Sequence, residues 1–245
     1  MIEVHNINKS FNGKQVLKDI STSFLSGKTN LIIGRSGSGK TVLLKVIAGL
    51  VQAEVGNVLY DKKNVVLMKK DEHDMLRRRI GMVFQGGALF DSMTVAQNVQ
   101  FPLDMFSKQT AAQKRDRVNF CLERVNIEDA HQKHPGELSG GMIKRVAIAR
   151  AIVLRPKFLL CDEPNSGLDP ITATRIDKLI SSITSEFNMT TIVNTHDMNS
   201  VSNIGEQVIF LHKGIKEWEG SSKNILAANS EALHEFIATA KDRFE

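Results

Sequence analysis

Near its start the chain alternates apolar and polar residues, the period of a strand with one buried face. The dipeptide Asn12-Gly13 interrupts this alternation and favours the tight turn of a β-hairpin. The pattern therefore predicts antiparallel strands at the beginning of the chain.

Further along, short and almost continuously apolar segments are typical of strands buried inside a sheet. They are TNLIIG at 29–34, IGMVFQ at 80–85, KFLLCDE at 157–163, TTIVNTHD at 190–197 and QVIFLHKG at 207–214. Their spacing leaves room for a helix between most consecutive strands.

Between these predicted strands, apolar residues recur three or four positions apart, which is the periodicity of a helix. Helices are predicted at residues 41–50, through a middle stretch of roughly residues 87–150, and after Asp169-Pro170, a suitable N-cap and first turn. Strands that alternate with helices predict an α/β fold with a parallel sheet, and the helical middle is an insertion into it. The apolar stripes are Val118, Cys121, Leu122 and Val125, and Ile176, Leu179, Ile180, Ile183 and Phe187.

Composition narrows the class of protein. The residues are 42% hydrophobic and 24% charged, as in a globular protein, and no apolar run approaches the roughly 20 residues that span a bilayer. The first residues lack the apolar core of a signal peptide, so we expect the protein to stay in the cytosol. Cys121 and Cys161 have no partner at metal-ligand spacing, which predicts reduced, buried thiols.

The net charge of +5 is the next constraint. Clusters such as Arg77-Arg78-Arg79 would suit nucleic acid or an anionic membrane face. A solvated helix face explains the same residues more simply, and we expect no nucleic-acid partner.

One segment carries a specific chemical signal. Residues 34–41, GRSGSGKT, match G-x4-G-K-[ST], a phosphate-binding loop, between a predicted strand and a predicted helix. Glycines let successive N–H groups turn toward phosphate oxygens, and the helix N-terminus adds partial positive charge. Lys40 would reach the β- and γ-phosphates, and Thr41 would offer its hydroxyl to Mg²⁺. The ATP-binding residues predicted here are Gly34, Arg35, Ser36, Gly37, Ser38, Gly39, Lys40 and Thr41.

Two more predicted strands end in polar side chains. Asp162 and Glu163 close the segment FLLCDE, at the strand end where α/β sheets place ligands. Asp162 fits a role in holding Mg²⁺, usually through water, and Glu163 fits a carboxylate that polarises an attacking water. His196 follows a neighbouring strand and would reach the γ-phosphate. The simpler alternatives, an acidic helix cap and a structural histidine, are disfavoured by the intact phosphate loop.

The segment ELSGGMIKRVAIARAI, residues 137–152, narrows the family. Its LSGG motif and basic amphipathic helix resemble the signature of ATP-binding cassette (ABC) proteins, and SGLDP after the acidic pair resembles their D-loop. In chain order, Phe11, GRSGSGKT, Gln85, LSGGM, FLLCDE, SGLD and His196 match that family's set. The resemblance covers nearly the whole chain.

The resemblance implies a fold. It is a P-loop NTPase with a RecA-like parallel sheet core, an N-terminal antiparallel β subdomain and an inserted α-helical subdomain. Residues 1–222 would form this nucleotide-binding domain, and residues 223–245 a helical tail.

The resemblance also implies an ATPase that uses Mg²⁺. Phe11 would stack on adenine, and Gln85 would sense the metal and the attacking water. Ser139 and the adjoining N–H groups would bind the ATP of the opposite subunit, so that a head-to-tail homodimer completes two sites. Met142 departs from the family's usual glutamine, which weakens the case for a side-chain contact there. The implied catalytic residues are Glu163, His196 and Gln85, the metal residues Thr41, Gln85 and Asp162, and the further ATP-binding residues Phe11, Ser139, Gly140 and Gly141.

The residues after Gln85 lie where the family receives a short helix from a transmembrane permease. Gly86 and Gly87 would supply mobility, and Ala88, Leu89 and Phe90 an apolar pocket for that helix. Alternatively, Leu89 and Phe90 pack inside the helical insertion.

The stretch FQGGALFDSMTVAQNVQFPL, with LSGGM and DPIT, is similar to one branch of the family, the Mla-type or mammalian-cell-entry-type lipid transport ATPases. This likeness implies phospholipid cargo, a lipid-binding partner subunit, and a place at the cytoplasmic face of the inner membrane through the permease. The alternatives are a transporter of another substrate, a soluble ABC ATPase acting on DNA or ribosomes, and a scaffold without turnover. A single cassette without a long coiled coil argues against the second, and the intact Glu163 and His196 against the third.

The end of the chain has a further apolar stripe. It consists of Leu233, Phe236, Ile237, Ala240 and Phe244, with Glu231, Glu235, Lys241 and Asp242 on the other face. This helix would pack on its own subunit or dock on the opposite one. In the second case, deletion from Asn229 onward would weaken dimerisation more than ATP binding.

Overall fold

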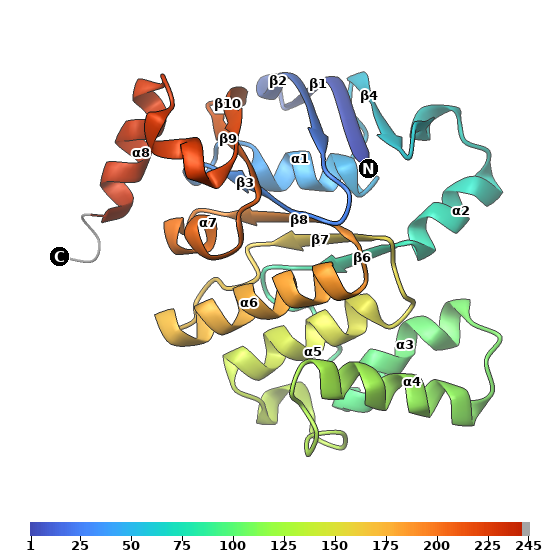
Figure 1. Ribbon diagram of the computed structural model, residues 1–245. Helices are drawn as coiled ribbons and strands as arrows, with labels where there is room; N and C mark the ends of the chain where they lie inside the picture. Colours follow the sequence, from blue (N-terminus) through green and yellow to red (C-terminus); the bar gives the residue numbers. More distant parts are fainter. Residues whose placement is uncertain (242–245) are drawn as a thin grey trace.

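Two β-sheets organise the chain, and helix α1 (Lys40–Ile47) lies between them (Figure 1). The computed structural model describes residues 1–241. The hairpin between the first two strands turns at Asn12-Gly13, both with positive φ, as the sequence predicts. The smaller, antiparallel sheet has the order β2-β1-β4-β5 and consists of β1 (Ile2–Phe11), β2 (Lys14–Phe24), β4 (Val55–Tyr60) and β5 (Lys63–Asn64).

The larger sheet has the order β10-β9-β3-β8-β7-β6, and all neighbours are parallel except β10 and β9. All five apolar segments predicted as strands lie in it. The antiparallel edge strand β10 was not predicted, because its sequence IKEWEG lacks an apolar run. The strands are β3 (Thr29–Ile33), β6 (Ile80–Val83), β7 (Phe158–Asp162), β8 (Thr190–Thr195), β9 (Gln207–His212) and β10 (Ile215–Gly220).

Helices cover the larger sheet on the side away from α1 (Figure 1). Between β6 and β7 the chain forms three α-helices, which begin at Val95 rather than near residue 87. The Asp169 side chain caps α6, accepting from the Thr172 N–H at 2.9 Å, as predicted. Within residues 1–241, none of the helices is both long and apolar enough to cross a membrane. The α-helices are α2 (Lys70–Arg78), α3 (Val95–Phe106), α4 (Ala111–Arg124), α5 (Gly140–Ile152), α6 (Pro170–Glu186), α7 (Met198–Ile204) and α8 (Glu231–Lys241), and the short 3₁₀ segments are Val65–Leu67, Pro135–Glu137 and Ser222–Ala227.

The parallel strands carry apolar side chains on both faces, which explains their unbroken apolar sequences. In β3, Leu31 and Ile33 join the core formed with α3, α4, α5 and α6, whereas Ile32 joins the core around α1. In β7, Cys161 joins the first of these cores and Leu160 joins the core around α1. The sheet therefore rigidly supports the loops at its carboxyl edge. Both predicted thiols, Cys121 and Cys161, are buried and free.

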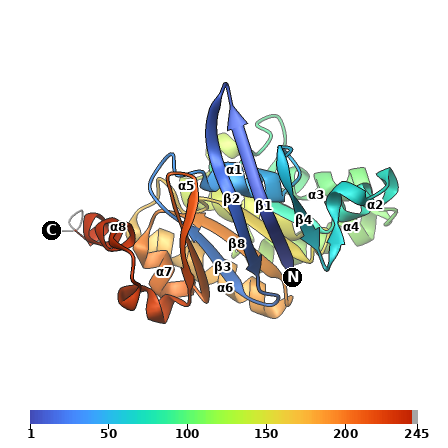
Figure 2. The ribbon, with the colours of Figure 1, turned by 90° about the horizontal axis from the view of Figure 1, so that it is seen from above.

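The tail helix α8 packs on its own chain, beside β9 and β10 (Figure 2). Leu233, Phe236 and Ile237 are buried in the core, and the Phe236 ring centroid lies 5.5 Å from that of Phe210. Of the two predicted alternatives, the described residues show the first, because the apolar stripe packs against β9 of its own chain. Phe244 and Asp242 of the predicted helix lie outside the described residues.

Candidate functional site

The phosphate loop lies between β3 and α1, at the carboxyl edge of the larger sheet. Gly37 and Gly39 have φ of 77° and 106°, and a Cβ at Gly39 would come within 2.9 Å of Leu17. The buried Lys40 ammonium spans the loop, donating to the carbonyl oxygens of Gly34 at 2.9 Å and Arg35 at 3.2 Å. Burial lowers the pKa of Lys40, and the nearby carboxylates oppose this shift.

The loop also has an unsatisfied buried oxygen. The hydroxyl of Ser38 has no hydrogen-bond partner among the described residues. A buried polar atom without a partner is costly in a folded chain, and a phosphate group supplies one. The loop thus fits a bound nucleotide phosphate.

Oxygen atoms suited to Mg²⁺ gather beside the loop. The Thr41 hydroxyl donates to Asp162 Oδ1 at 3.0 Å, and the Asn194 amide donates to the same oxygen at 3.0 Å. Asn194 Oδ1 is buried without a partner among the described residues. Hydroxyl, carboxylate and amide oxygens are the hard ligands that Mg²⁺ prefers, so these residues fit the ion. Asn194 was not predicted, although a polar residue inside the apolar strand TTIVNT was the available signal.

The three predicted catalytic side chains meet at one carboxylate. His196 Nδ1 lies 3.2 Å from Glu163 Oε1, and Gln85 Nε2 donates to Glu163 Oε2 at 3.3 Å. The Lys40 ammonium is 3.7 Å from Glu163 Oε1. The bond with His196 is the main cause that lowers the pKa of Glu163, and it raises the pKa of His196. Glu163 is therefore held ionised beside the phosphate loop.

Sheet register explains this convergence. Asp162 at the end of β7 pairs with Asn194 in β8, and Ile33 at the end of β3 pairs with Thr195. Glu163 itself has a positive φ of 45°, and its N–H donates to the Asn194 carbonyl at 3.0 Å. Such a backbone conformation is costly for a side chain of this size and persists only when its surroundings hold it. The neighbouring strand end supplies that support.

The signature residues lie in a separate hollow. The Ser139 hydroxyl caps α5, accepting from the Met142 N–H at 3.3 Å. Ser139, Gly140 and Gly141 line a cavity of about 730 Å³ with residues 167–169, and none of residues 34–41 lines it. A Cβ at Gly141 would come within 2.8 Å of Thr172 Cγ2, so glycine permits the close packing of α5 on α6. One chain thus carries its phosphate loop and its signature in different places.

Two further predicted positions have simple surroundings. The Phe11 ring is 44% exposed at the end of β1, with the Lys9 ammonium 5.1 Å from its centroid. An exposed aromatic face is available for stacking. The half-buried Met142 side chain packs against the core.

Lys144 is a site residue that the sequence did not single out. Its buried ammonium, on α5, donates to the Gln85 carbonyl oxygen. Burial lowers the pKa of Lys144, and the Glu163 charge opposes this shift. The signature helix is therefore tied directly to the backbone of Gln85.

Comparison with known families decides the identity. The sequence pattern of the family described as "ABC transporter" matches residues 17–166. The chain belongs to the ABC transporter family. It is an ATPase, with ATP and Mg²⁺ as its nucleotide and metal.

Relatives and solved structures agree with this assignment. The "probable ribonucleotide transport ATP-binding protein mkl" of Mycobacterium leprae is 34% identical over 236 residues, 96% of this chain and 68% of its own length. The "methionine import ATP-binding protein MetN" of Clostridioides difficile is 39% identical, over 97% of this chain and 74% of its own length. The ATP-binding cassette MJ0796, a dimer in a post-hydrolysis state bound to ADP and Pi, has a TM-score of 0.82 and 32% identity, over 91% of this chain and 99% of that chain. The cbiO1 structure from Clostridium perfringens has a TM-score of 0.84 and 30% identity, over 99% of this chain and 96% of its own.

The loop after Gln85 opens onto an apolar groove of about 340 Å³ on this ABC ATPase. The Arg150 guanidinium donates to the carbonyl oxygens of Gly87 and Ala88, both at 2.8 Å, so this part of the loop is pinned. Leu89 does not line the groove, since its side chain packs against the subunit's own core. For the half-buried Leu89 the structure favours the alternative, packing inside the subunit. The aromatic and apolar lining includes Phe84, Ala88, Phe90, Phe101, Pro102 and Phe106.

Gly87 also has a packing role, because a Cβ there would come within 2.8 Å of Ile143 on α5. Its φ is 78°, whereas a Cβ at Gly86 would meet nothing. Of the two glycines predicted to supply mobility, Gly87 is therefore held in place by a close helix contact.

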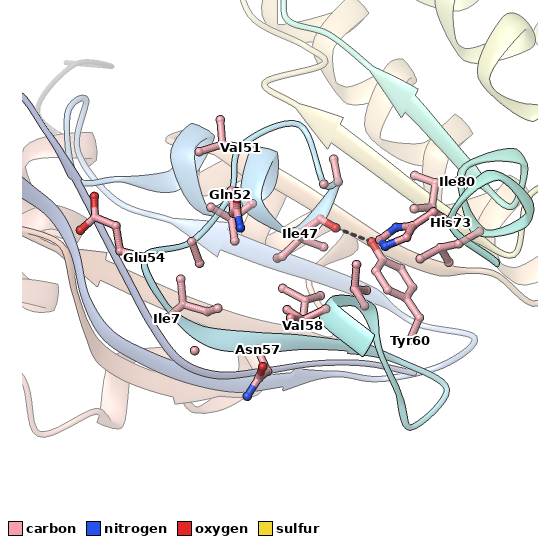
Figure 3. Close-up of a pocket in the computed structure, with 18 of the residues that line it drawn as sticks. Ile7, Ile47, Val51, Gln52, Glu54, Asn57, Val58, Tyr60, His73 and Ile80 are labelled. Atoms are coloured by element: carbon pink, nitrogen blue, oxygen red, sulfur yellow. Dashed lines mark hydrogen bonds between the residues drawn. The ribbon is translucent and has the colours of Figure 1, made fainter. Parts of the chain in front are cut away.

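A second cavity, of about 510 Å³, lies between the end of α1, β4 and α2 (Figure 3). Its walls include Ile7, Val58 and Ile80, and the Tyr60 hydroxyl donates to the Ile47 carbonyl at 2.7 Å. None of the predicted ATP, metal or catalytic residues lines it. This cavity lies apart from the nucleotide chemistry.

Proposed function

We propose that this chain is the ATPase subunit of a membrane transporter and works as a homodimer bound to a transmembrane permease. The observation that carries the proposal is the convergence of Lys40, Gln85 and His196 on Glu163, with the signature residues in a separate hollow. A site of this kind lacks its second phosphate-binding terminus until another copy supplies one. Two-fold symmetry would complete both sites at once.

The geometry supports the following proposed roles. Glu163 accepts a proton from the water that attacks the γ-phosphate, and Gln85 and His196 orient that carboxylate and the water. Lys40 and the N–H groups of the loop hold the β- and γ-phosphates. Thr41, Asp162 and Gln85, joined by Asn194, would hold Mg²⁺, which neutralises phosphate charge when bound. Phe11 would stack on adenine.

Complementation between two inactive variants tests the head-to-tail dimer. Lys40→Ala removes the phosphate-loop cation, and Ser139→Arg blocks the signature terminus. Each variant alone should be inactive, whereas a refolded mixture should recover up to about a quarter of the parental sites, because a heterodimer restores one site of two. The measurement is phosphate release from each variant and from the mixture. No recovery would mean that each site is completed within one chain.

The groove beside the loop is where we propose that the permease docks. Phe90 is 43% exposed, and its ring centroid lies 4.9 Å from that of Phe101. The Phe90 ring would be buried against the permease in a largely apolar interface. Burying a charged side chain at this position would carry a large desolvation cost. An incoming amphipathic helix fits such a surface.

Phe90→Glu should release the permease while leaving ATP affinity of the isolated subunit unchanged. Ile215→Glu is the matched control, since Ile215 is 45% exposed on the distant strand β10. The measurement is recovery of the membrane subunit in a pull-down from detergent extract. Retention of the permease by Phe90→Glu, or its equal loss with Ile215→Glu, would count against this groove.

We propose phospholipid as the cargo, with a lipid-binding partner subunit and attachment at the cytoplasmic face of the inner membrane through the permease. The support is the likeness of residues 84–103 to lipid transport ATPases. The relatives named for methionine and ribonucleotide transport favour a small solute as the second candidate. Lipid analysis of the purified complex separates the two, since a solute transporter would retain no defined phospholipid.

A further inference from the structure

Three buried polar side chains form a closed ring near the ATP residues. Asn165, Asp177 and Ser200 are 8%, 1% and 0% exposed. The Ser200 hydroxyl donates to Asp177 Oδ2 at 2.7 Å. The Asn165 amide donates to Asp177 Oδ1 at 3.2 Å and to the Ser200 hydroxyl oxygen at 2.9 Å. Every donor hydrogen of the two neutral side chains is therefore used inside the ring.

The ring has no cationic member. Burial raises the pKa of Asp177 to about 6, and the nearby Asp197 charge adds to the shift. In the described part of the chain, the Asn165 amide and the Ser200 hydroxyl are the only hydrogen-bond donors to this carboxylate. Because a buried charge without donors is costly, each of the three side chains depends on the other two.

The ring joins three parts of the chain whose relative positions determine the geometry of the catalytic site. Asn165 is in the loop that follows Glu163, and Ser200 is on α7, directly after the loop that carries His196. Asp177 is on α6, which contacts α7 and begins at the cap residue Asp169. The ring therefore links both loops to one long helix.

We propose that Asn165, Asp177 and Ser200 form a positioning network that holds the Glu163 loop and the His196 loop at their working separation. The network touches neither ATP nor the attacking water. It acts by keeping the Glu163 and His196 side chains at the 3.2 Å contact described above. The inference rests on the proposed catalytic roles of those two residues.

Single substitutions break the ring at defined atoms. Ser200→Ala removes the hydroxyl and leaves one Asn165 hydrogen and one Asp177 oxygen unpaired. Asp177→Asn keeps the size but replaces one of the two oxygens that accept from Asn165 and Ser200 by an NH2 group, so the present pattern of bonds cannot be kept. Ser200→Thr retains the hydroxyl and should retain activity.

Thr184→Val is the matched control. Its hydroxyl is also buried on α6, where it donates to the Ile180 carbonyl at 2.8 Å and lies 2.6 Å from the Thr191 hydroxyl. Thr191 is at the start of β8, away from the carboxyl edge of the sheet. Loss of this pair lowers stability without touching either catalytic loop.

The test measures kcat and the KM for ATP of the full-length chain, at a temperature well below its melting temperature. The melting temperature is measured separately for each variant. Ser200→Ala and Asp177→Asn should lower kcat about tenfold or more with KM within about twofold, because small misplacement of reacting groups costs rate rather than affinity. Thr184→Val should lower the melting temperature but keep kcat.

A kcat loss no larger than that of Thr184→Val at equal stability, or a change in KM alone, overturns the network. Glu163→Gln separates this failure from failure of the proposed function. Inactive Glu163→Gln with fully active Ser200→Ala and Asp177→Asn removes only the network. Active Glu163→Gln removes the catalytic role on which the network rests.

Discussion

Glu163→Gln should leave ATP bound and lower its hydrolysis by about 100-fold or more, the usual contribution of a positioned base. An amide of the same size cannot take the proton of the attacking water. Lys40 loses its 3.7 Å ion pair with Glu163 but keeps its bonds to the Gly34 and Arg35 carbonyl oxygens. The measurements are phosphate release and equilibrium ATP binding.

Glu206→Gln is the matched control for this change. Glu206 bonds to Lys28 at 2.6 Å and to the Thr29 N–H at 2.9 Å, at the opposite edge of the larger sheet. The same chemical change there should leave turnover at the parental level. Hydrolysis by Glu163→Gln at the parental rate would show that another group is the base.

Lys40→Ala should weaken ATP binding itself, by about 10- to 100-fold, the range expected for losing a hydrogen bond to a charged group. The ammonium lies inside the loop, and no neighbouring cation replaces it at Gly34 and Arg35 among the described contacts. Lys45→Ala, a partly exposed lysine on the same helix, serves as the control. Equilibrium binding of ATP to both variants is the measurement, and unchanged affinity in Lys40→Ala would contradict the assignment.

Local sequence patterns determined most elements of the fold. The five apolar runs became the five parallel strands, because a strand buried on both faces needs apolar residues at consecutive positions. Asn12-Gly13 and Asp169-Pro170 marked a hairpin turn and a helix start, since their preferences depend on the nearest residues. The edge strand β10 was not predicted from the sequence, because its pairing with β9 depends on tertiary structure rather than on its own apolar pattern.

For the site, the motifs determined which residue types are present and which family the chain belongs to. Phosphate loops and signature motifs are contiguous, so their chemistry is visible in the sequence. Sheet register alone brought Asn194 beside Asp162 and set the contact of His196 with Glu163, since both depend on which strands are neighbours.

Packing decided the remaining questions. Leu89 turned into the core and Phe90 toward the groove, although both are apolar neighbours in one loop. The apolar stripe of α8 packs against β9 of its own chain. Asn165, Asp177 and Ser200 form their hydrogen-bonded ring from three separate segments. The sequence by itself determined most of the elements, the motifs and the family, because these depend on residues close along the chain. Only the tertiary structure decided which way an apolar side chain faces and which distant polar groups pair, because those depend on the space left by every other element.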